Sequence, residues 1–204
     1  EVENRKKLRK SLVAKIDIPK GIKLNDELLT SKRPGIGIPP SDIKKVIGKI
    51  SKNTKAVFIT HVQGFNGLTD KLLHTLQEKG IPLIEDVCES HGATFKGKKL
   101  GTFGLISNFS FYYAHHMSTI EGGMVCTDDE EIYQMIRMFR SHGMIREIKN
   151  KELKNKYIDN YRDLNPEFIF AFPAYNVRNT EISAVIGINQ LKRLDQNNKK
   201  RNKN

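Results

Sequence analysis

From about residue 50 onward, short apolar segments alternate with amphipathic segments, and this alternation is the strongest constraint on the fold. Residues 55–62 (KAVFITHV), 81–88 (IPLIEDVC) and 106–113 (ISNFSFYY) are apolar runs that predict buried strands. Residues 67–80 (GLTDKLLHTLQEKG) have the apolar spacing of a helix and end in glycine. Strands that alternate with helices predict an α/β fold with a mostly parallel sheet and flanking helices.

Four further segments extend this pattern. Residues 122–129 (GGMVCTDD) predict another strand, and residues 129–143 predict a helix with acids in its first turn and a glycine at its end. Residues 180–196 predict a final amphipathic helix. The polar stretch 149–162 predicts a loop or a loosely formed helix.

The first 48 residues follow a different pattern, which predicts a small β-rich module. Residues 11–18 (SLVAKIDI) alternate as a strand does, and residues 32–40 (KRPGIGIPP) predict an irregular loop. Because the pattern changes without a flexible linker, we place one domain at residues 1–48 and a second at residues 49–204. The chain starts at Glu1 and stops inside a polar, helix-like segment, so we expect both ends to be cuts.

Charge and composition exclude several classes of partner. The formal charge is +12, but residues 5–10 and 192–204 hold 11 of the 35 basic residues, and no basic-aromatic module is present. We therefore expect solvated ends and no nucleic-acid partner. No run approaches the roughly 18 apolar residues of a membrane span, and no signal peptide opens the chain. These features predict a cytoplasmic protein with no membrane partner, in which Cys88 and Cys126 are free thiols.

Acidic residues follow the predicted strand at residues 81–88. Glu85, Asp86 and Glu89 lie in the segment IPLIEDVCESHGATF. Ligands of open α/β sheets bind at the carboxyl ends of the strands. An aspartate there can pair with the protonated ring nitrogen of a pyridoxal-type cofactor. The alternative is that Asp86 only caps the following turn.

The segment SFYYAHHMSTIEGG at residues 110–123 follows the next predicted strand. Ser110 ends that strand, where its hydroxyl can hold a phosphate oxygen, and His115 and His116 lie shortly after it. A zinc site is disfavoured, because adjacent histidine side chains point apart and no third ligand has a familiar spacing. We therefore predict no metal and interpret the histidines as groups that transfer protons.

Three segments carry a resemblance to a known family: residues 84–104, 110–131 and 173–195. Over about residues 50–204 the chain resembles the DegT/DnrJ/EryC1/StrS family of enzymes that depend on pyridoxal 5′-phosphate (PLP) and modify nucleotide sugars. The resemblance implies a partial type I PLP-dependent transferase fold and a homodimer. It also implies that Asp86 binds the pyridine nitrogen, that Ser110 binds the cofactor phosphate, and that Asn176 reaches the phosphate of the partner subunit's cofactor.

One departure from the family pattern narrows the expected reaction. Most members have a lysine five residues after the serine, and that lysine holds PLP covalently; here the position is His115. Glu89 also stands where the aminotransferases often have glutamine. Both changes resemble the subgroup that removes the 3-hydroxyl from a 4-keto-6-deoxy sugar nucleotide with pyridoxamine 5′-phosphate (PMP). The resemblance therefore implies His115 as the base, with His116 orienting it, in the synthesis of bacterial surface polysaccharides.

The N-terminal module resembles the SAF (antifreeze-like, β-clip-like) domain that ends bacterial sialic acid synthases. That resemblance implies that Arg33, in the KRPG segment, contacts an N-acetylmannosamine substrate; the alternative is a solvated loop arginine. Because both resemblances are partial, we expect an incomplete chain. An ordinary sugar aminotransferase and an inactive fusion of two neighbouring genes, joined near GKISKNT at residues 48–54, stay open as alternatives.

Overall fold

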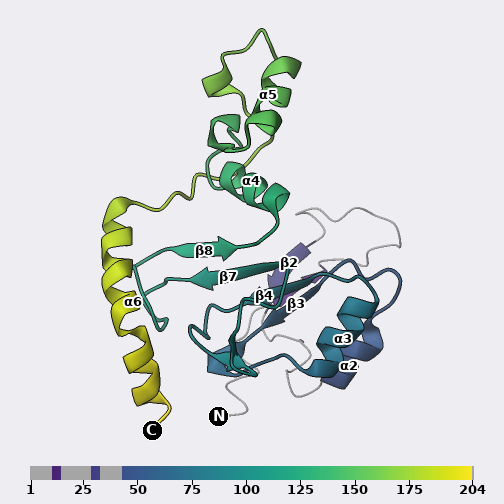
Figure 1. Ribbon diagram of the computed structural model, residues 1–204, viewed down its shortest axis with the longest axis vertical. Coiled ribbons are helices and arrows are strands. Elements are labelled where there is room, and N and C mark those ends of the chain that lie inside the picture. The colour runs from purple at the N-terminus through teal and green to yellow at the C-terminus, as the bar shows by residue number, and fades with distance from the viewer. Residues whose placement is uncertain (1–10, 15–28, 33–42, 204) are drawn as a thin grey trace. The chain divides into compact units, whose positions relative to one another are not determined.

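The computed structural model of the chain describes residues 11–14, 29–32 and 43–203 (Figure 1). The chain divides into two compact units, residues 1–50 and residues 51–204. In the first unit, β1 (Ser11–Ala14) pairs antiparallel with β2 (Leu29–Lys32), and α2 spans Ile43–Lys49. Arg33, the residue predicted to contact substrate, lies outside the described residues.

A four-stranded sheet forms the centre of the second unit (Figure 1). Its strands are β3 (Val57–Thr60), β4 (Leu83–Asp86), β7 (Ile106–Ser110) and β8 (Gly123–Cys126), in the spatial order β3-β4-β7-β8. The first three are parallel, and β8 runs antiparallel to β7. The predicted α/β fold with a mostly parallel sheet is therefore confirmed, and the carboxyl ends of three strands meet at one edge.

Helix α3 (Asp70–Glu78) returns the chain from β3 to β4, after the short 3-10 helix η2 (Val62–Gly64). The Thr69 hydroxyl accepts a hydrogen bond from the Leu72 N–H and so caps the first turn of α3. Leu72 and Leu76, one turn apart, are buried. They belong to the apolar core of the unit, together with Val57, Leu68, Ile81, Leu83, Val87 and Leu100.

A small hairpin between β4 and β7 is absent from the sequence prediction. Strands β5 (Thr94–Phe95) and β6 (Lys98–Lys99) pair across Lys96 and Gly97, which both have positive φ angles, 50° and 79°. Two such residues are the signature of a type I′ turn, in which asparagine or aspartate usually precedes the glycine. The turn was not predicted from the sequence because Lys96 stands where asparagine or aspartate is usual.

A second cluster of short helices follows β8. It contains α4 (Glu130–Phe139), η3 (Ile145–Glu147), α5 (Lys151–Asn160) and η4 (Pro166–Phe168). These elements share a small core of Met138, Ile145, Ile148 and Ile169. The polar stretch at residues 149–162 forms the regular helix α5, because the Asn150 side chain caps its first turn.

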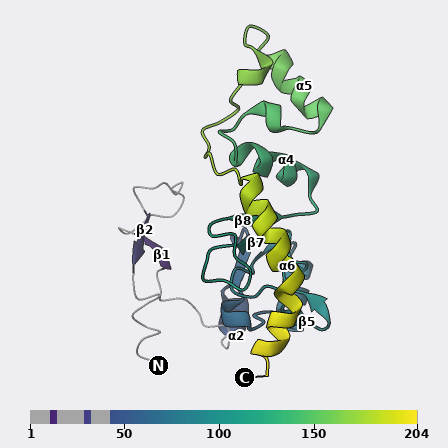
Figure 2. The same cartoon turned by 90° about the vertical axis from the view of Figure 1, so that its left-hand side faces the viewer.

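The last element, α6 (Glu181–Arg201), extends five residues beyond the predicted helix and runs past the ends of β7 and β8 (Figures 1 and 2). The Asn179 amide donates to the Gly123 carbonyl at 3.3 Å, and the Asn198 amide donates to the His91 carbonyl at 2.7 Å. These two bonds connect the start and the end of α6 with the loops beside the sheet. Within the described ranges, the structure contains no helix that is long and apolar enough to cross a membrane.

Candidate active site

Three polar residues lie at the carboxyl ends of the three parallel strands. Thr60 ends β3, Asp86 ends β4 and Ser110 ends β7. The strand register places Thr60 beside Asp86 and Asp86 beside Asn108. Since ligands of parallel sheets bind outside this edge, these side chains define the candidate site.

The Asp86 carboxylate is fixed by three donors. The Cys88 N–H and the Asn108 amide donate to Oδ1 at 3.0 and 3.1 Å, and the Thr60 hydroxyl donates to Oδ2 at 3.3 Å. An ionised carboxylate has about four acceptor positions. One position, on Oδ2, therefore remains for a further N–H donor, as the pairing of Asp86 with a pyridine nitrogen requires. The Cys88 bond also fits the alternative that Asp86 caps the following turn.

Ser110 is half-buried and adjoins this carboxylate through Asn108, because alternate residues of a strand share one face of the sheet. The Ser110 Oγ accepts a hydrogen bond from the Tyr112 N–H at 3.3 Å. A hydroxyl that accepts one hydrogen bond keeps its proton for donation. Ser110 can therefore donate to an anionic oxygen at this edge.

Glu85, one residue before Asp86, has a different environment. Its side chain is fully buried, and its oxygens accept from the N–H groups of Gly101, Phe103 and Gly104 at 2.7–2.8 Å. Burial raises the pKa of Glu85, but hydrogen bonds from His61 and these three N–H groups outweigh burial and keep the pKa below its usual value. Glu85 holds the loop after β6 against the sheet and has no acceptor position to spare for a ligand.

The donor from His61 can be assigned to one ring nitrogen. The Gly67 N–H donates to Nδ1 of His61 at 3.1 Å, so Nδ1 is an acceptor. The proton is therefore on Nε2, which lies 3.3 Å from Oε1 of Glu85. The sequence pattern indicated no role for His61 or Glu85, although both lie at predicted strand ends.

His115 and His116 lie in the loop between β7 and β8, together with a third histidine that the sequence did not single out. The ring of His91 lies 6.2 Å from that of His115 and 6.0 Å from that of His116, measured between centroids. His91 is 4 % exposed. Burial and the neighbouring His116 and His115 lower its pKa to about 4, so His91 is neutral at pH 7.

His116 and Glu89 lie at the border of this cluster. Burial, followed by the charge of Arg201 and by His115, lowers the pKa of His116, while Glu89 acts in the opposite direction. The Glu89 carboxylate accepts a hydrogen bond from the Gln63 N–H at 2.8 Å. These interactions connect the loops after β3, β4 and β7 around the predicted proton-transfer residues.

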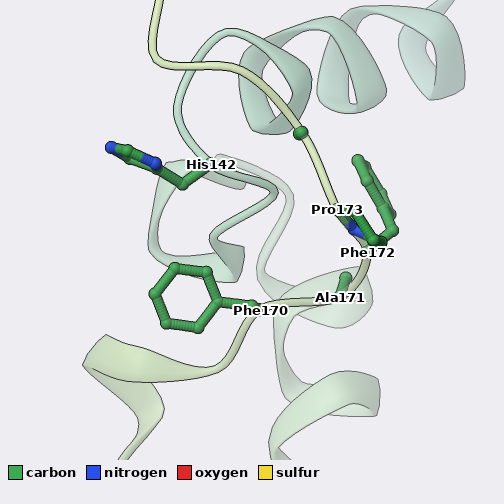
Figure 3. A pocket seen from close by; sticks show the side chains of 6 residues that line it. His142, Phe170, Ala171, Phe172 and Pro173 are labelled. Atoms are coloured by element: carbon green, nitrogen blue, oxygen red, sulfur yellow. The ribbon is translucent and has the colours of Figure 1, made fainter.

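Asn176 belongs to a different part of the second unit. It forms a bridge with Ser141, just after α4, and its exposed side chain accepts a hydrogen bond from Arg178 at 3.2 Å. The neighbouring segment 170–174 lines a mostly apolar hollow of about 520 Å³ together with His142 (Figure 3).

Cys88 and Cys126 are free thiols, as predicted. Burial and the neighbouring Asp86 carboxylate raise the pKa of Cys88 to about 12, which makes it a poor nucleophile. Across the part of the chain that the structure describes, no group of histidine, cysteine and acidic side chains is arranged to hold a metal ion.

Comparison with known proteins connects this geometry with a family. GDP-4-keto-6-deoxy-D-mannose 3-dehydratase of Escherichia coli O55:H7 is 42% identical over 155 residues, which cover 75% of this chain and 39% of that protein. The Yersinia pseudotuberculosis protein of the same name is 39% identical over 165 residues, 80% of this chain and 41% of that protein. A solved E. coli structure of this dehydratase with bound hydrated PLP has a TM-score of 0.67 and 40% identity, covering 76% of this chain and 39% of that one.

The chain thus spans about two fifths of the length of these relatives. A SAF domain profile matches residues 9–56, and the profile of the DegT/DnrJ/EryC1/StrS aminotransferase family matches residues 36–204. The two matches overlap at residues 36–56, which include the GKISKNT segment. The family match covers most of the chain, and the strands, helices and acidic strand end described above lie within it. The chain belongs to the DegT/DnrJ/EryC1/StrS aminotransferase family.

Proposed function

We propose that this chain carries the cofactor-facing part of an enzyme that removes the 3-hydroxyl from a 4-keto-6-deoxy sugar nucleotide, in bacterial surface polysaccharide synthesis. The observation that carries the proposal is the pairing of a fixed Asp86 carboxylate, with one free acceptor position, and a histidine where the family has its lysine. The names of the most similar relatives make GDP-4-keto-6-deoxymannose the first substrate to test.

The residues at the strand ends fit PMP or PLP. The free position on Oδ2 of Asp86 would accept the ring N–H, and the Ser110 hydroxyl would donate to the phosphate. In a homodimer, the exposed Asn176 of one subunit would reach the phosphate bound by its partner. When bound, the cofactor supplies an aromatic ring that accepts electrons as bonds to the substrate break. Asp86 supports this role by keeping the ring nitrogen protonated.

His115 stands where other family members have the lysine that binds the cofactor covalently, and we assign it proton transfer instead. An imidazole forms no lasting bond to the cofactor aldehyde, but it can accept and return a proton during catalysis. His116, whose pKa is lowered, stays neutral and orients its neighbour. Glu89 limits this lowering and anchors the loop after β3 through Gln63. The cofactor would therefore be held by non-covalent contacts alone.

Lysine substitution at the two histidines tests the proposal. The full chain is incubated with PLP, reduced with borohydride and mapped by peptide mass spectrometry. We expect H115K to gain an adduct at position 115, at an occupancy well above that of surface lysines, whereas the matched control H116K gains little because adjacent side chains point apart. Adding D86N to H115K lowers the occupancy severalfold, since the ring nitrogen loses its partner.

Two results would contradict the proposal. One is equal labelling of H115K and H116K at surface-lysine level, because position 115 would then not face the cofactor. The other is a stoichiometric covalent adduct on the wild-type chain at a native lysine, because that lysine would provide the attachment that we assign to no residue.

A sugar aminotransferase is disfavoured because the sequence has histidine at the attachment position. An inactive fusion is favoured by the overlap of two family matches at residues 36–56. The division into domains at residues 1–48 and 49–204 stays our prediction. For the N-terminal domain, contact of Arg33 with an N-acetylmannosamine-type sugar remains our prediction. Equilibrium binding of PMP separates the hypotheses: stoichiometric binding that D86N weakens supports the enzyme, and no saturable binding supports the fusion.

A further inference from the structure

Asn108, near the end of β7, forms hydrogen bonds to the end of β4 and to the residues that follow it. Its amide nitrogen donates to Oδ1 of Asp86 at 3.1 Å and to Sγ of Cys88 at 3.2 Å. Its backbone carbonyl accepts a further bond from the Val87 N–H at 2.9 Å. Both the backbone and the side chain of Asn108 therefore join the two central strands of the sheet.

The two side-chain bonds fix the orientation of the Asn108 amide. An amide nitrogen has two N–H donors, whereas the carbonyl oxygen of the same side chain is an acceptor. A rotation of the amide by about 180° would bring that oxygen against the Asp86 carboxylate, so that two acceptors would face each other. The N–H group therefore stays on Oδ1 as long as Asp86 is ionised.

The donors are divided unequally between the two oxygens of Asp86. Oδ1 accepts from the Cys88 N–H and from the Asn108 amide, which fills both of its acceptor positions. Oδ2 accepts from the Thr60 hydroxyl at 3.3 Å and keeps one position free. The terminal torsion of an aspartate is broad and roughly two-fold, so donors are needed to hold the carboxylate in one orientation. Asn108 supplies the side-chain donor that holds Oδ1 and leaves Oδ2 to a ligand.

The place of Asn108 on β7 suits this role. The register puts Asn108 directly beside Asp86, and Ser110 lies two residues further along the same face of the strand. Two residues of a strand advance by about 6.6 Å. The same strand thus sets the position of the carboxylate and, two residues later, that of the hydroxyl which we assign to the phosphate.

We propose that Asn108 is a positioning residue for the cofactor site: its amide holds Oδ1 of Asp86 so that Oδ2 is presented to the protonated ring nitrogen of PMP or PLP. The inference rests on the proposed function, because it requires that Asp86 pairs with that nitrogen. The alternative is that Asn108 only ties β7 to β4. A structural tie would affect all ligands of the site equally, whereas a positioning role concerns the ring nitrogen alone.

The test compares two ligands in equilibrium binding to the full chain: PMP, and the analogue in which a C–H group replaces the ring nitrogen. We expect the wild type to prefer PMP and D86N to lose this preference. N108L replaces the amide with an apolar group of similar size and should reduce the preference about tenfold, as expected for the loss of one hydrogen bond to a charged group. S107A, at a buried residue on the opposite face of β7, is the matched control and should keep the wild-type preference.

An N108L preference equal to that of the wild type would overturn the inference, even if both ligands bound more weakly, because Asn108 would then be a structural tie. If N108L does not fold, N108A, which removes the amide without adding bulk, decides by the same ratio of affinities. Failure of the proposed function is distinct. In that case the wild type itself would bind the two ligands equally well, or D86N would keep the preference, and the inference would fall with the proposed function.

Discussion

Two buried polar clusters lie near the carboxyl edge of the sheet, and they differ in how fully their hydrogen bonds are satisfied. In the Glu85 cluster, three backbone N–H groups and His61 donate to one carboxylate. In the histidine cluster, both nitrogens of His91 and one of His116 have no partner within the described residues. The Glu85 cluster, which is fully hydrogen-bonded, stabilises the fold. The histidine cluster keeps unpaired ring nitrogens, which a proton-transfer site needs.

Removing the charge of Glu85 gives the largest expected effect. E85Q places an amide N–H₂ group among N–H donors, which leaves buried groups unpaired and lowers the free energy of unfolding by about 3 kcal/mol. Urea denaturation of the full chain measures this loss. The matched control is E78Q at an exposed i,i+4 pair with His74, expected to change stability by less than about 0.5 kcal/mol. Equal losses in the two variants would show that the Glu85 cluster is not structural.

The histidine cluster predicts a loss of stability in mild acid. The folded pKa of His91 is lowered to about 4 from an ordinary 6.5, so in this window the unfolded chain binds a proton that the folded chain does not. Stability is therefore greatest above pH 6.5 and falls as the pH decreases toward 4. Between pH 7 and pH 5 the loss is about 2 kcal/mol from His91, with a smaller part from His116.

Urea denaturation at the two pH values compares the wild type with H91F, which has no proton to bind at that position. We expect H91F to remove most of the loss and H74F to leave it intact. Below about pH 4.5 protonation of Glu85, whose pKa is lowered, adds a separate loss. A wild-type stability that is constant from pH 7 to pH 5 would show that His91 is accessible to protons in the folded state.

Cys88 reports on the charge of Asp86. Burial and Asp86 together raise the thiol pKa to about 12, so D86N should increase the thiolate fraction and speed alkylation at pH 8 roughly tenfold. Iodoacetamide labelling with peptide mass spectrometry measures both cysteines at once. Cys126, whose pKa burial raises independently of Asp86, is the internal control. An unchanged Cys88 rate, or an equal increase at Cys126, would contradict the assignment of a charged Asp86 beside the thiol.

The smallest expected effect is at α6. N198A removes the amide that donates to the His91 carbonyl and should cost about 1 kcal/mol. Amide hydrogen exchange should become faster in the last turns of α6 while the sheet is unaffected. Q196A, on the same helix and exposed, is the control. Unchanged exchange in N198A would mean that α6 is held by other contacts.

Much of the fold could be read from the sequence because it rests on local patterns. Apolar runs predicted β3, β4 and β7, and the glycine at residue 80 predicted where α3 ends. The hairpin of β5 and β6 was missed because its turn has an unusual residue before glycine. Helix α5 was predicted only as a loop or loose helix, because its polar sequence owes its regularity to the Asn150 cap.

Site residues could be predicted from the sequence only where a reactive side chain lies at the end of a predicted strand. Asp86 and Ser110 each follow an apolar run, so their placement followed from the sheet. Thr60 and Asn108 donate hydrogen bonds to Asp86 from the two neighbouring strands, and the rings of His91 and His115, from two different loops, lie close together. Such contacts depend on register and loop path, which local periodicity does not encode. The alternation of Asn108 with Ser110 was the one signal that could have located a further site residue.

The most direct measurement is a crystal structure of the full chain with bound PMP. We predict the ring nitrogen within about 3 Å of the Asp86 carboxylate, the phosphate on the Ser110 hydroxyl, and the His115 ring on the reactive face of the cofactor. PMP bound away from the end of β4, or a His115 ring packed into the interior and out of reach of the cofactor, would contradict the assignment of Asp86 and His115 to one active site.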